Sequence, residues 1–254
     1  MSKDKEIIYV DHHPYPEDID TALLMKSGVK VIHDDSASTS ELAYRSFEDW
    51  FEPDKLGALR VAIFGAIGDY EDETPFIRES LRNWDRRSIY LQSGVLVDGL
   101  EGSRKEHDFK RKVVSMIVEG ELPTSNDELV SSAIANAGRN EELRKKVMAE
   151  AKKSGDVGYV LNVDGSLGRE AIYAAVVVDA KVGLGGQTRE DLGLIEMSLR
   201  VRRGNIDLNK ILRRISEKMS GCPGGGHEDA AGARVPIDRF QEFLEMLNQE
   251  IEKT

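Results

Sequence analysis

Three adjacent residues near the N-terminus place two imidazoles beside a carboxylate. Asp11, His12 and His13 directly follow the apolar run at residues 6–10, a pattern typical of a buried strand. In parallel α/β sheets, ligands bind at the carboxyl ends of the strands. Neutral imidazole and carboxylate together suit Mn²⁺ or a similar divalent ion. The triplet alone predicts a metal corner but leaves open a chance surface cluster ahead of the proline-rich turn at Pro14.

A further carboxylate, Asp69, stands at the end of a mostly apolar segment. Residues 56–67 are predicted to form a buried helix, and Gly68 separates this helix from Asp69. A carboxylate in that position could reach the same ion as the triplet. The alternative is a solvated aspartate in the C-terminal turn of a helix.

A glycine-rich segment near the C-terminus could bind an anion. Residues 224–232 hold three consecutive glycines, a histidine and a further glycine, and the backbone amides of such a segment can approach a phosphate without obstruction by side chains. A glycine-rich turn capped by the histidine is the structural alternative. A strand predicted at residues 193–201 carries a serine and an arginine, which favour anion binding. The candidate substrate-binding residues are Ser198, Arg200, Gly224, Gly225, Gly226 and His227.

The composition is that of a soluble globular protein. Hydrophobic residues make up 40% of the chain and charged residues 32%, and no apolar run approaches the roughly 18–20 residues of a membrane span. The single cysteine, Cys222, excludes an internal disulfide framework and a multi-cysteine zinc site. The charged N-terminus has no apolar signal-peptide region, so we expect a cytoplasmic protein.

The net charge of −11 argues against a basic coat for duplex DNA. Within the chain, residues 198–214 nevertheless hold six lysines and arginines against one aspartate. Such a patch can attract phosphates, and it can equally be a solvated basic face.

The expected elements fall into two groups that separate at Ser154 and Gly155. The first group is predicted to begin with strands at 6–10 and 29–32. Capping boxes predict two helices, one that begins at Ser38 and Glu41 and one that runs from Ser125 and Glu128 to Gly138. The other predicted helices are the buried helix at 56–67, charged helices over 75–120 and an exposed helix at 141–153. The second is predicted to contain a strand at 158–163, a helix or strand-rich segment at 167–182, a flexible break at 183–186, the strand at 193–201, an amphipathic helix at 208–219, a short strand at 231–235 and a closing helix over 237–251.

Together these motifs resemble the DHH superfamily of metal-dependent phosphoesterases, and the resemblance covers nearly the whole chain. The superfamily includes RecJ-type single-strand exonucleases, oligoribonuclease-like enzymes and cyclic-dinucleotide phosphodiesterases; the spacing is most similar to archaeal RecJ-like proteins. The resemblance implies that Asp11, His12 and Asp69 bind metal. It implies that Asp11 and His13 are catalytic, with His13 facing the phosphate. The candidate substrate-binding residues would then belong to a DHH-associated domain that holds the nucleic-acid end.

The chain departs from the family pattern ahead of the triplet. Family members carry aspartate motifs there, including an Asp-x-Asp, whereas only ten residues precede Asp11. Two-metal hydrolysis needs ligands that clamp both ions, activate a water and stabilise the leaving oxygen, and Asp11, His12 and Asp69 suffice for one ion. We expect the remaining ligands to lie upstream, to come from another chain, or to be absent from a non-catalytic relative.

The expected protein is thus an α/β protein with two domains. An incomplete doubly wound parallel sheet is predicted for residues 1–120, a helical connector for 121–155 and a smaller α/β substrate-binding domain for 156–254. We expect hydrolysis of phosphodiesters in single-stranded DNA or short RNA with Mn²⁺, or alternatively Mg²⁺, as cofactor. We expect replication or repair proteins as further partners, and we expect no association with a membrane. The competing hypothesis is a catalytically inactive RecJ-like protein that binds nucleic acid or serves as a replication scaffold.

Overall fold

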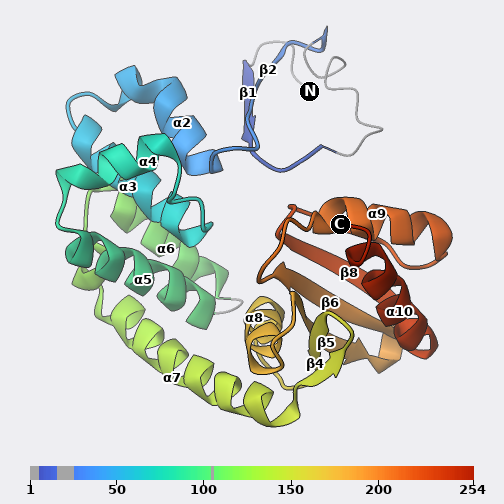
Figure 1. Cartoon of the computed structure of the whole chain (residues 1–254). Coiled ribbons are helices and arrows are strands. Elements are labelled where there is room, and N and C mark those ends of the chain that lie inside the picture. The colour runs from blue at the N-terminus through green and yellow to red at the C-terminus, as the bar shows by residue number, and fades with distance from the viewer. Residues whose placement is uncertain (1–5, 16–25, 104–105) are drawn as a thin grey trace. The chain divides into compact units, whose positions relative to one another are not determined.

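The computed structural model describes residues 6–15, 26–103 and 106–254 (Figure 1). The charged N-terminus on which the expected cytoplasmic location depends lies almost entirely outside these residues. The chain divides into two compact units, residues 1–138 and 139–254. Among the described residues, no helix is both long enough and apolar enough to cross a membrane.

The first unit begins with two parallel strands at the predicted positions. β1 (Ile7–Asp11) pairs with β2 (Val29–His33) in parallel, so that Asp11 lies opposite His33 at the carboxyl ends of both strands. Each strand reads as a short apolar run because its residues are half-buried on both faces. The pair therefore presents its polar residues together at one edge, as expected for a ligand site in a parallel sheet.

After β2, the described residues of the first unit are mainly helical (Figure 1). Their bounds are α2 (Thr39–Phe47), η1 (Glu48–Phe51), α3 (Lys55–Gly68), α4 (Pro75–Ser80), η2 (Leu81–Asn83), α5 (Arg86–Gly102), α6 (His107–Val118) and η3 (Pro123–Ser125). The predicted cap at Ser38 is confirmed, because its side chain accepts a hydrogen bond from the Glu41 amide. The core of this unit centres on α3, where Ile63 and Phe64 are buried, and α3 ends at Asp69 as predicted.

A single long helix, α7 (Asp127–Glu150), runs through the boundary between the two units. Two predictions were wrong here. The cap is Asn126 rather than Ser125, since the Asn126 side chain accepts from the Leu129 amide at 2.9 Å. Gly138 lies inside the helix and does not end it; no atom lies within 4 Å of the position that a β-carbon would take there. The structure divides the chain at this glycine, within the range 121–155 predicted for the connector.

The second unit is built on a six-stranded sheet in the order β3-β4-β5-β6-β8-β7. Its strands are β3 (Lys152–Ser154), β4 (Val157–Leu161), β5 (Val182–Arg189), β6 (Leu194–Val201), β7 (Gly224–Gly226) and β8 (Ala230–Pro236). β4 and β5 are parallel and joined through α8 (Leu167–Val177), and the other pairs are antiparallel. Gly155, proposed as a domain boundary, instead turns the chain between β3 and β4 with φ +55°.

Helices cover both faces of this sheet (Figure 1). On one face lie α9 (Leu208–Lys218) and α10 (Phe240–Ile251), and η5 (Ile237–Arg239) precedes α10; η4 (Glu190–Leu192) joins β5 to β6. The apolar side of α9 and α10 packs on Leu184, Leu199 and Val235 to form the largest core. On the other face, α8 covers β4 and β5. The α/β class predicted from the sequence is confirmed.

The glycines at 183–186 form part of β5 and not the flexible break that the sequence suggested. Two of them, Gly183 and Gly185, are required by the close approach of α8. A β-carbon at Gly183 would lie 1.8 Å from the Ala171 carbonyl oxygen, and one at Gly185 would lie 2.3 Å from the Leu167 carbonyl oxygen. Glycine in a strand therefore marks helix packing at these positions.

Candidate metal centre and phosphate-binding surface

The predicted site residues form two groups, one in each unit. Asp11, His12, His13 and Asp69 lie together in the first unit. The substrate-binding candidates lie on the sheet and the glycine-rich strand of the second unit.

The His12 imidazole is the centre of the first group. It is only 4% exposed, and its Nε2 lies 3.1 Å from Asp69 Oδ2. Its other nitrogen, Nδ1, lies 2.7 Å from the Thr39 hydroxyl at the first position of α2. β1, α2 and the end of α3 thus meet at this ring, which fixes its plane and directs Nε2 toward the carboxylate.

The Asp11 carboxylate organises the exposed side of the same group. Oδ1 accepts from the His12 amide at 2.9 Å and lies 2.8 Å from His13 Nδ1, while Oδ2 accepts from the Tyr9 hydroxyl at 2.6 Å. Burial by itself would raise the pKa of Asp11, but the hydrogen bonds from Tyr9, His13 and the backbone together hold it well below its ordinary value. The same contact raises the pKa of Tyr9 to about 12. Asp11 is therefore ionised at neutral pH.

The donor set fits a divalent cation. His12 Nε2 and the Asp69 carboxylate, 3.1 Å apart, are the imidazole and oxygen ligands that Mn²⁺ accepts, and the ionised Asp11 precedes His12 in the chain. The other nitrogen of His12 contacts Thr39, and the second nitrogen of a metal-binding histidine commonly has such a hydrogen-bond partner. The His13 side chain is 64% exposed, and its Nδ1 contact with Asp11 leaves Nε2 facing away from that carboxylate.

Three supporting residues of this group were not predicted from the sequence. Tyr9 could have been found, because it lies two positions before Asp11 and therefore on the same side of β1. His33 faces Asp11 across the strand pair and places its Nε2 2.8 Å from the His13 carbonyl oxygen. Thr39 carries no comparable signal, since only the tertiary fold brings α2 to His12.

In the second unit, Ser198 and Arg200 share one face of β6. The strand alternates, with Met197 and Leu199 buried in the core and Ser198 and Arg200 on the opposite face. Ser198 lies opposite Gly232 of β8. Gly232 in turn lies opposite Gly225 of β7, so a hydroxyl and two glycines form a row across the sheet.

The glycine segment is a strand and not the loop that its composition suggested. Gly224, Gly225 and Gly226 form β7, which pairs with β8 as an edge hairpin. The Asn209 side chain accepts a hydrogen bond from the Gly226 amide at 3.2 Å and so ties β7 to α9. The His227 amide donates to the Ala230 carbonyl at 2.9 Å in the turn that closes the hairpin.

A shallow groove of about 520 Å³ lies over this part of the sheet. Its wall includes Gly224 of β7 and Gly232 of β8, and its rim carries Glu196 and Arg234, which form an ion pair at 3.4 Å. Gly232, the partner of Ser198 across β6 and β8, thus lines this groove, while α8 contacts β4, β5 and β6.

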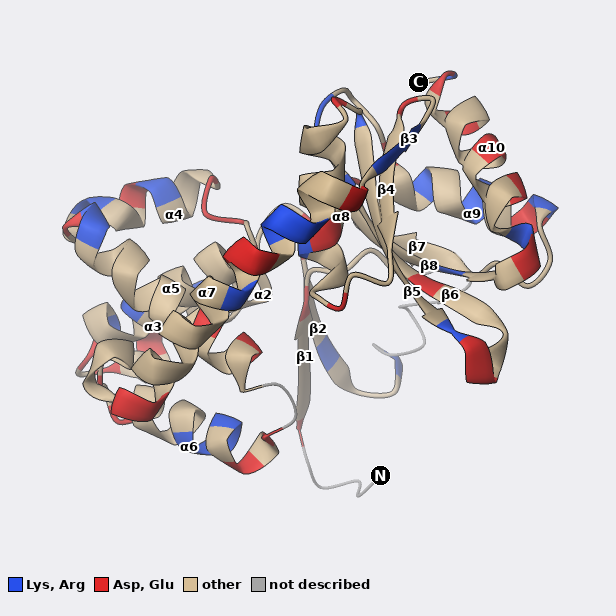
Figure 2. Ribbon diagram, turned by 90° about the horizontal axis from the view of Figure 1, so that it is seen from below, with Lys and Arg blue, Asp and Glu red and all other residues tan. Residues whose placement is uncertain are grey.

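The predicted basic patch is mostly neutralised within the second unit. Arg202 and Arg203 both pair with Asp179, and Lys210 pairs with Asp207. The Lys and Arg residues seen along α9 (Figure 2) include Arg214 and Lys218, which converge on a single buried carboxylate, Glu250. For residues 198–214 as a whole, these ion pairs favour a structural role of the basic side chains over a patch that attracts phosphates.

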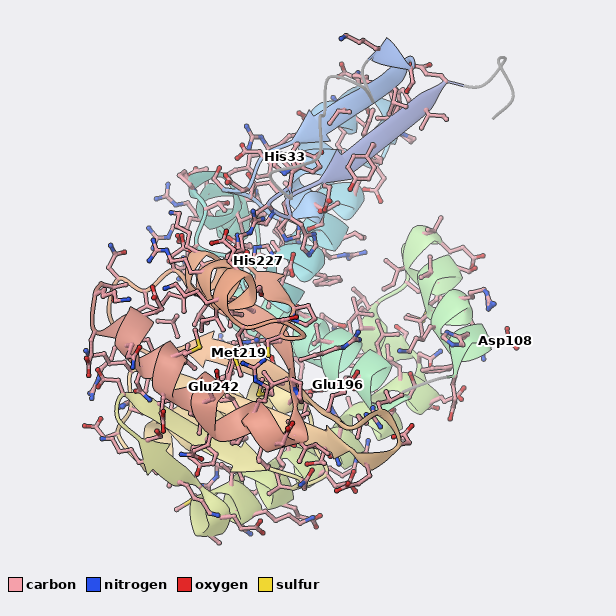
Figure 3. All side chains as sticks on the ribbon, turned by 90° about the vertical axis from the view of Figure 1, so that its right-hand side faces the viewer. His33, Asp108, Glu196, Met219, His227 and Glu242 are labelled. Carbon is pink, nitrogen blue, oxygen red and sulfur yellow. The ribbon has the colours of Figure 1, made fainter. Side chains whose placement is uncertain are left out.

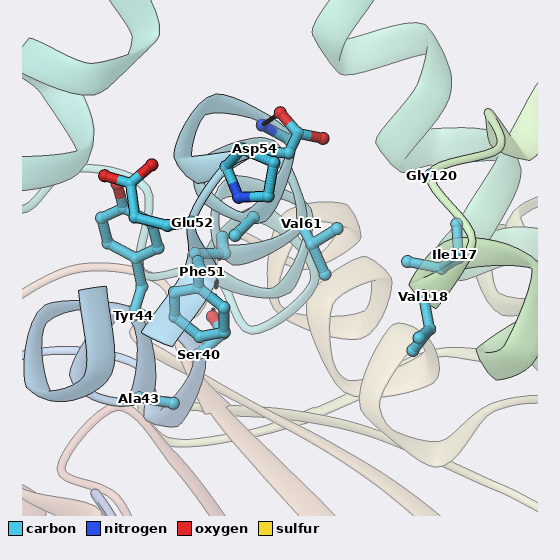
Figure 4. A pocket seen from close by; sticks show the side chains of 14 residues that line it. Ser40, Ala43, Tyr44, Phe51, Glu52, Asp54, Val61, Ile117, Val118 and Gly120 are labelled. Atoms are coloured by element: carbon cyan, nitrogen blue, oxygen red, sulfur yellow. Dashed lines mark hydrogen bonds between the residues drawn. The ribbon is translucent and has the colours of Figure 1, made fainter. Parts of the chain in front are cut away.

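A separate apolar pocket of about 470 Å³ opens in the first unit (Figure 4). Its walls come from α2, η1, α3 and the end of α6, with Phe51, Val61 and Val118 among the lining side chains. None of the four predicted site residues of this unit lines it. The pocket is therefore distinct from the Asp–His group.

Comparisons with known proteins find relatives of the second unit and of the whole fold. Residues 158–253 match the profile of the DHHA1 domain. Over the whole chain, the DHH domain of a member of a ribosomal protein family superposes with a TM-score of 0.71 at 16% identity, covering 97% of this chain and 63% of that one. No curated protein matches the sequence.

Two further solved structures share the fold. The pGpG-specific phosphodiesterase PggH from Vibrio cholerae has a TM-score of 0.55 at 10% identity, covering 87% of this chain and 76% of its own. RecJ from Thermus thermophilus in complex with Mn²⁺ has a TM-score of 0.60 at 15% identity, covering 99% and 42%. The chain thus spans 63% of the first relative and less than half of this RecJ. Residues 158–253 are thus similar to the DHHA1 domain, and the chain as a whole shares its fold with DHH-family proteins such as RecJ.

Proposed function

We propose that this chain takes part in metal-dependent hydrolysis of phosphodiester bonds in single-stranded nucleic acid or short oligonucleotides, with Mn²⁺ as the preferred ion. The observation that carries the proposal is the contact of His12 Nε2 with the Asp69 carboxylate at the end of α3, with Asp11 next to His12 at the end of β1. The DHH-family fold and the divalent ions in RecJ structures support it.

In the proposed mechanism, Asp11, His12 and Asp69 hold the ion. When bound, it would act as a Lewis acid and lower the pKa of a coordinated water. Thr39 keeps the His12 ring in place, and Tyr9 keeps Asp11 oriented and ionised. The exposed His13, anchored to Asp11 through Nδ1, presents its other nitrogen to a phosphate oxygen or to the leaving group.

The second unit would hold the substrate. Arg200 and Ser198 are proposed to contact a phosphate, and the glycines of β7 are proposed to let the backbone approach it closely. His227, in the turn after β7, would add a further donor. The groove lined by Gly224 and Gly232, the latter opposite Ser198, supports this assignment, because small residues let a nucleotide chain approach the sheet.

The experiment is release of mononucleotides from a 5′-labelled single-stranded oligomer in the presence of Mn²⁺, Mg²⁺ or EDTA. We expect Mn²⁺-dependent release and a loss of at least about 100-fold in Asp69→Ala, because a metal ligand is removed. Asp108→Ala is the matched control, since Asp108 is fully exposed on α6 (Figure 3). Tight binding of the oligomer without turnover under any metal would refute hydrolysis and favour the inactive, RecJ-like binding protein.

A further inference from the structure

The guanidinium of Arg200 is held at one end by its own strand. Nη1 donates to the Ser198 hydroxyl and to the Leu199 carbonyl oxygen, both at 2.8 Å. These contacts direct the guanidinium along the face of the sheet that α8 partly covers. The other terminal nitrogen, Nη2, lies beside the first turn of α8.

Gly168, in the first turn of α8, lies directly against that nitrogen. A β-carbon at this position would lie 2.8 Å from Arg200 Nη2 and 3.3 Å from Cζ. Carbon atoms do not approach a guanidinium so closely. The Arg200 side chain thus occupies space that exists only because residue 168 has no side chain.

Neither its backbone nor its other neighbours require glycine at position 168. It lies within a helix, where alanine is more favourable than glycine by up to about 1 kcal/mol. The three heavy atoms nearest to its β-carbon position all belong to the Arg200 side chain. Gly183 and Gly185, by contrast, face backbone atoms of α8 that cannot move aside.

We propose that Gly168 is a positioning residue for substrate binding, which acts by letting Arg200 lie against the first turn of α8. This inference rests on the proposed role of Arg200 in phosphate binding. A guanidinium fixed on two sides loses less conformational freedom when it forms a charged hydrogen bond to phosphate. A side chain at position 168 would displace the flexible end of Arg200 while leaving β6 and α8 in place.

The test measures binding of a fluorescein-labelled single-stranded oligonucleotide to the full chain by anisotropy, together with the melting temperature. We expect Gly168→Ala to weaken binding about tenfold while the melting temperature stays the same or rises. Gly138→Ala is the matched control, because it is also a helical glycine but has no atom within 4 Å of its β-carbon position. It should raise or preserve the melting temperature and leave binding unchanged.

A double-mutant cycle with Arg200→Ala separates the positioning role from direct obstruction of the ligand. Gly168→Ala should have no further effect in the Arg200→Ala background. An equal loss in both backgrounds would overturn the inference, as would wild-type binding by Gly168→Ala when Arg200→Ala binds weakly. If Arg200→Ala itself binds like the wild type, the proposed phosphate role of Arg200 fails as well, which distinguishes the two failures.

Discussion

At the residue scale, the metal-binding hypothesis depends on the fixed orientation of the His12 imidazole. The ring is buried, and each of its nitrogens has one close oxygen, from Thr39 and from Asp69. From the sequence, Asp69 could reach the same ion as His12, with a solvated aspartate as the alternative, and the resemblance to the DHH superfamily implied that both residues bind metal. The sequence did not predict Thr39, since a hydroxyl at the start of a helix is equally typical of local capping.

Thr39→Val tests the supporting role of this hydroxyl. The substitution keeps the shape of the side chain but removes the partner of His12 Nδ1. We expect Mn²⁺-dependent activity to fall about 10- to 100-fold, the usual cost of losing a contact to a metal-binding histidine. Thr39→Ser, which keeps the hydroxyl, should restore most of that loss. Equal activity of the valine and serine variants in the hydrolysis assay would contradict the role.

At the element scale, the packing of α8 on the sheet explains features of the second unit that the sequence did not. The segment 167–182 could not be assigned to helix or strand because its apolar residues are nearly continuous, which fits a helix buried on the sheet as well as a central strand. Gly183 and Gly185 of β5 were misinterpreted as part of a flexible break, because only the tertiary fold shows that α8 packs on them. By contrast, α9 was predicted well, since its apolar stripe is regular.

We expect Glu170 of α8 to make the stability of the second unit depend on pH. Its side chain is 1% exposed, Oε1 accepts from the Gly165 amide, and Oε2 has no hydrogen-bond partner among the described residues. Burial raises the pKa of Glu170 from 4.5 to about 7, and the charge of Asp164 adds to the shift. The folded state therefore holds this proton more tightly than the unfolded chain does, so stability falls as the pH rises from about 4.5 to 7.

Glu170→Gln should remove this pH dependence, because an amide keeps the contact to Gly165 without ionising. We expect the variant to be more stable than the wild type at pH 8, by on the order of 2–3 kcal/mol, and close to it at pH 4.5. Urea unfolding at the two pH values measures the difference. Glu142→Gln, an exposed position on α7, serves as the control. A constant difference between Glu170→Gln and the wild type at both pH values would refute the account.

At the scale of the whole molecule, the two predicted chemical roles lie in separate units. Each unit has its own core, and α7 contributes to both, with Leu129 buried in the first and Val147 in the second. From the sequence, it was reasonable to predict that a helix ends at Gly138 and that a domain boundary lies at Ser154, because a glycine and charged residues are found there. Neither could reveal that one helix continues through both units, because an exposed helical glycine and a terminating glycine look alike in sequence.

The most direct test of the central claim is a Mn²⁺ titration followed by electron paramagnetic resonance of the free ion. The wild type and Asp108→Asn should bind Mn²⁺, and Asp69→Asn should weaken binding at least about tenfold, because a neutral amide replaces a ligand carboxylate. Indistinguishable Mn²⁺ binding by the wild type and Asp69→Asn, or none by the wild type, would contradict a metal centre at His12 and Asp69.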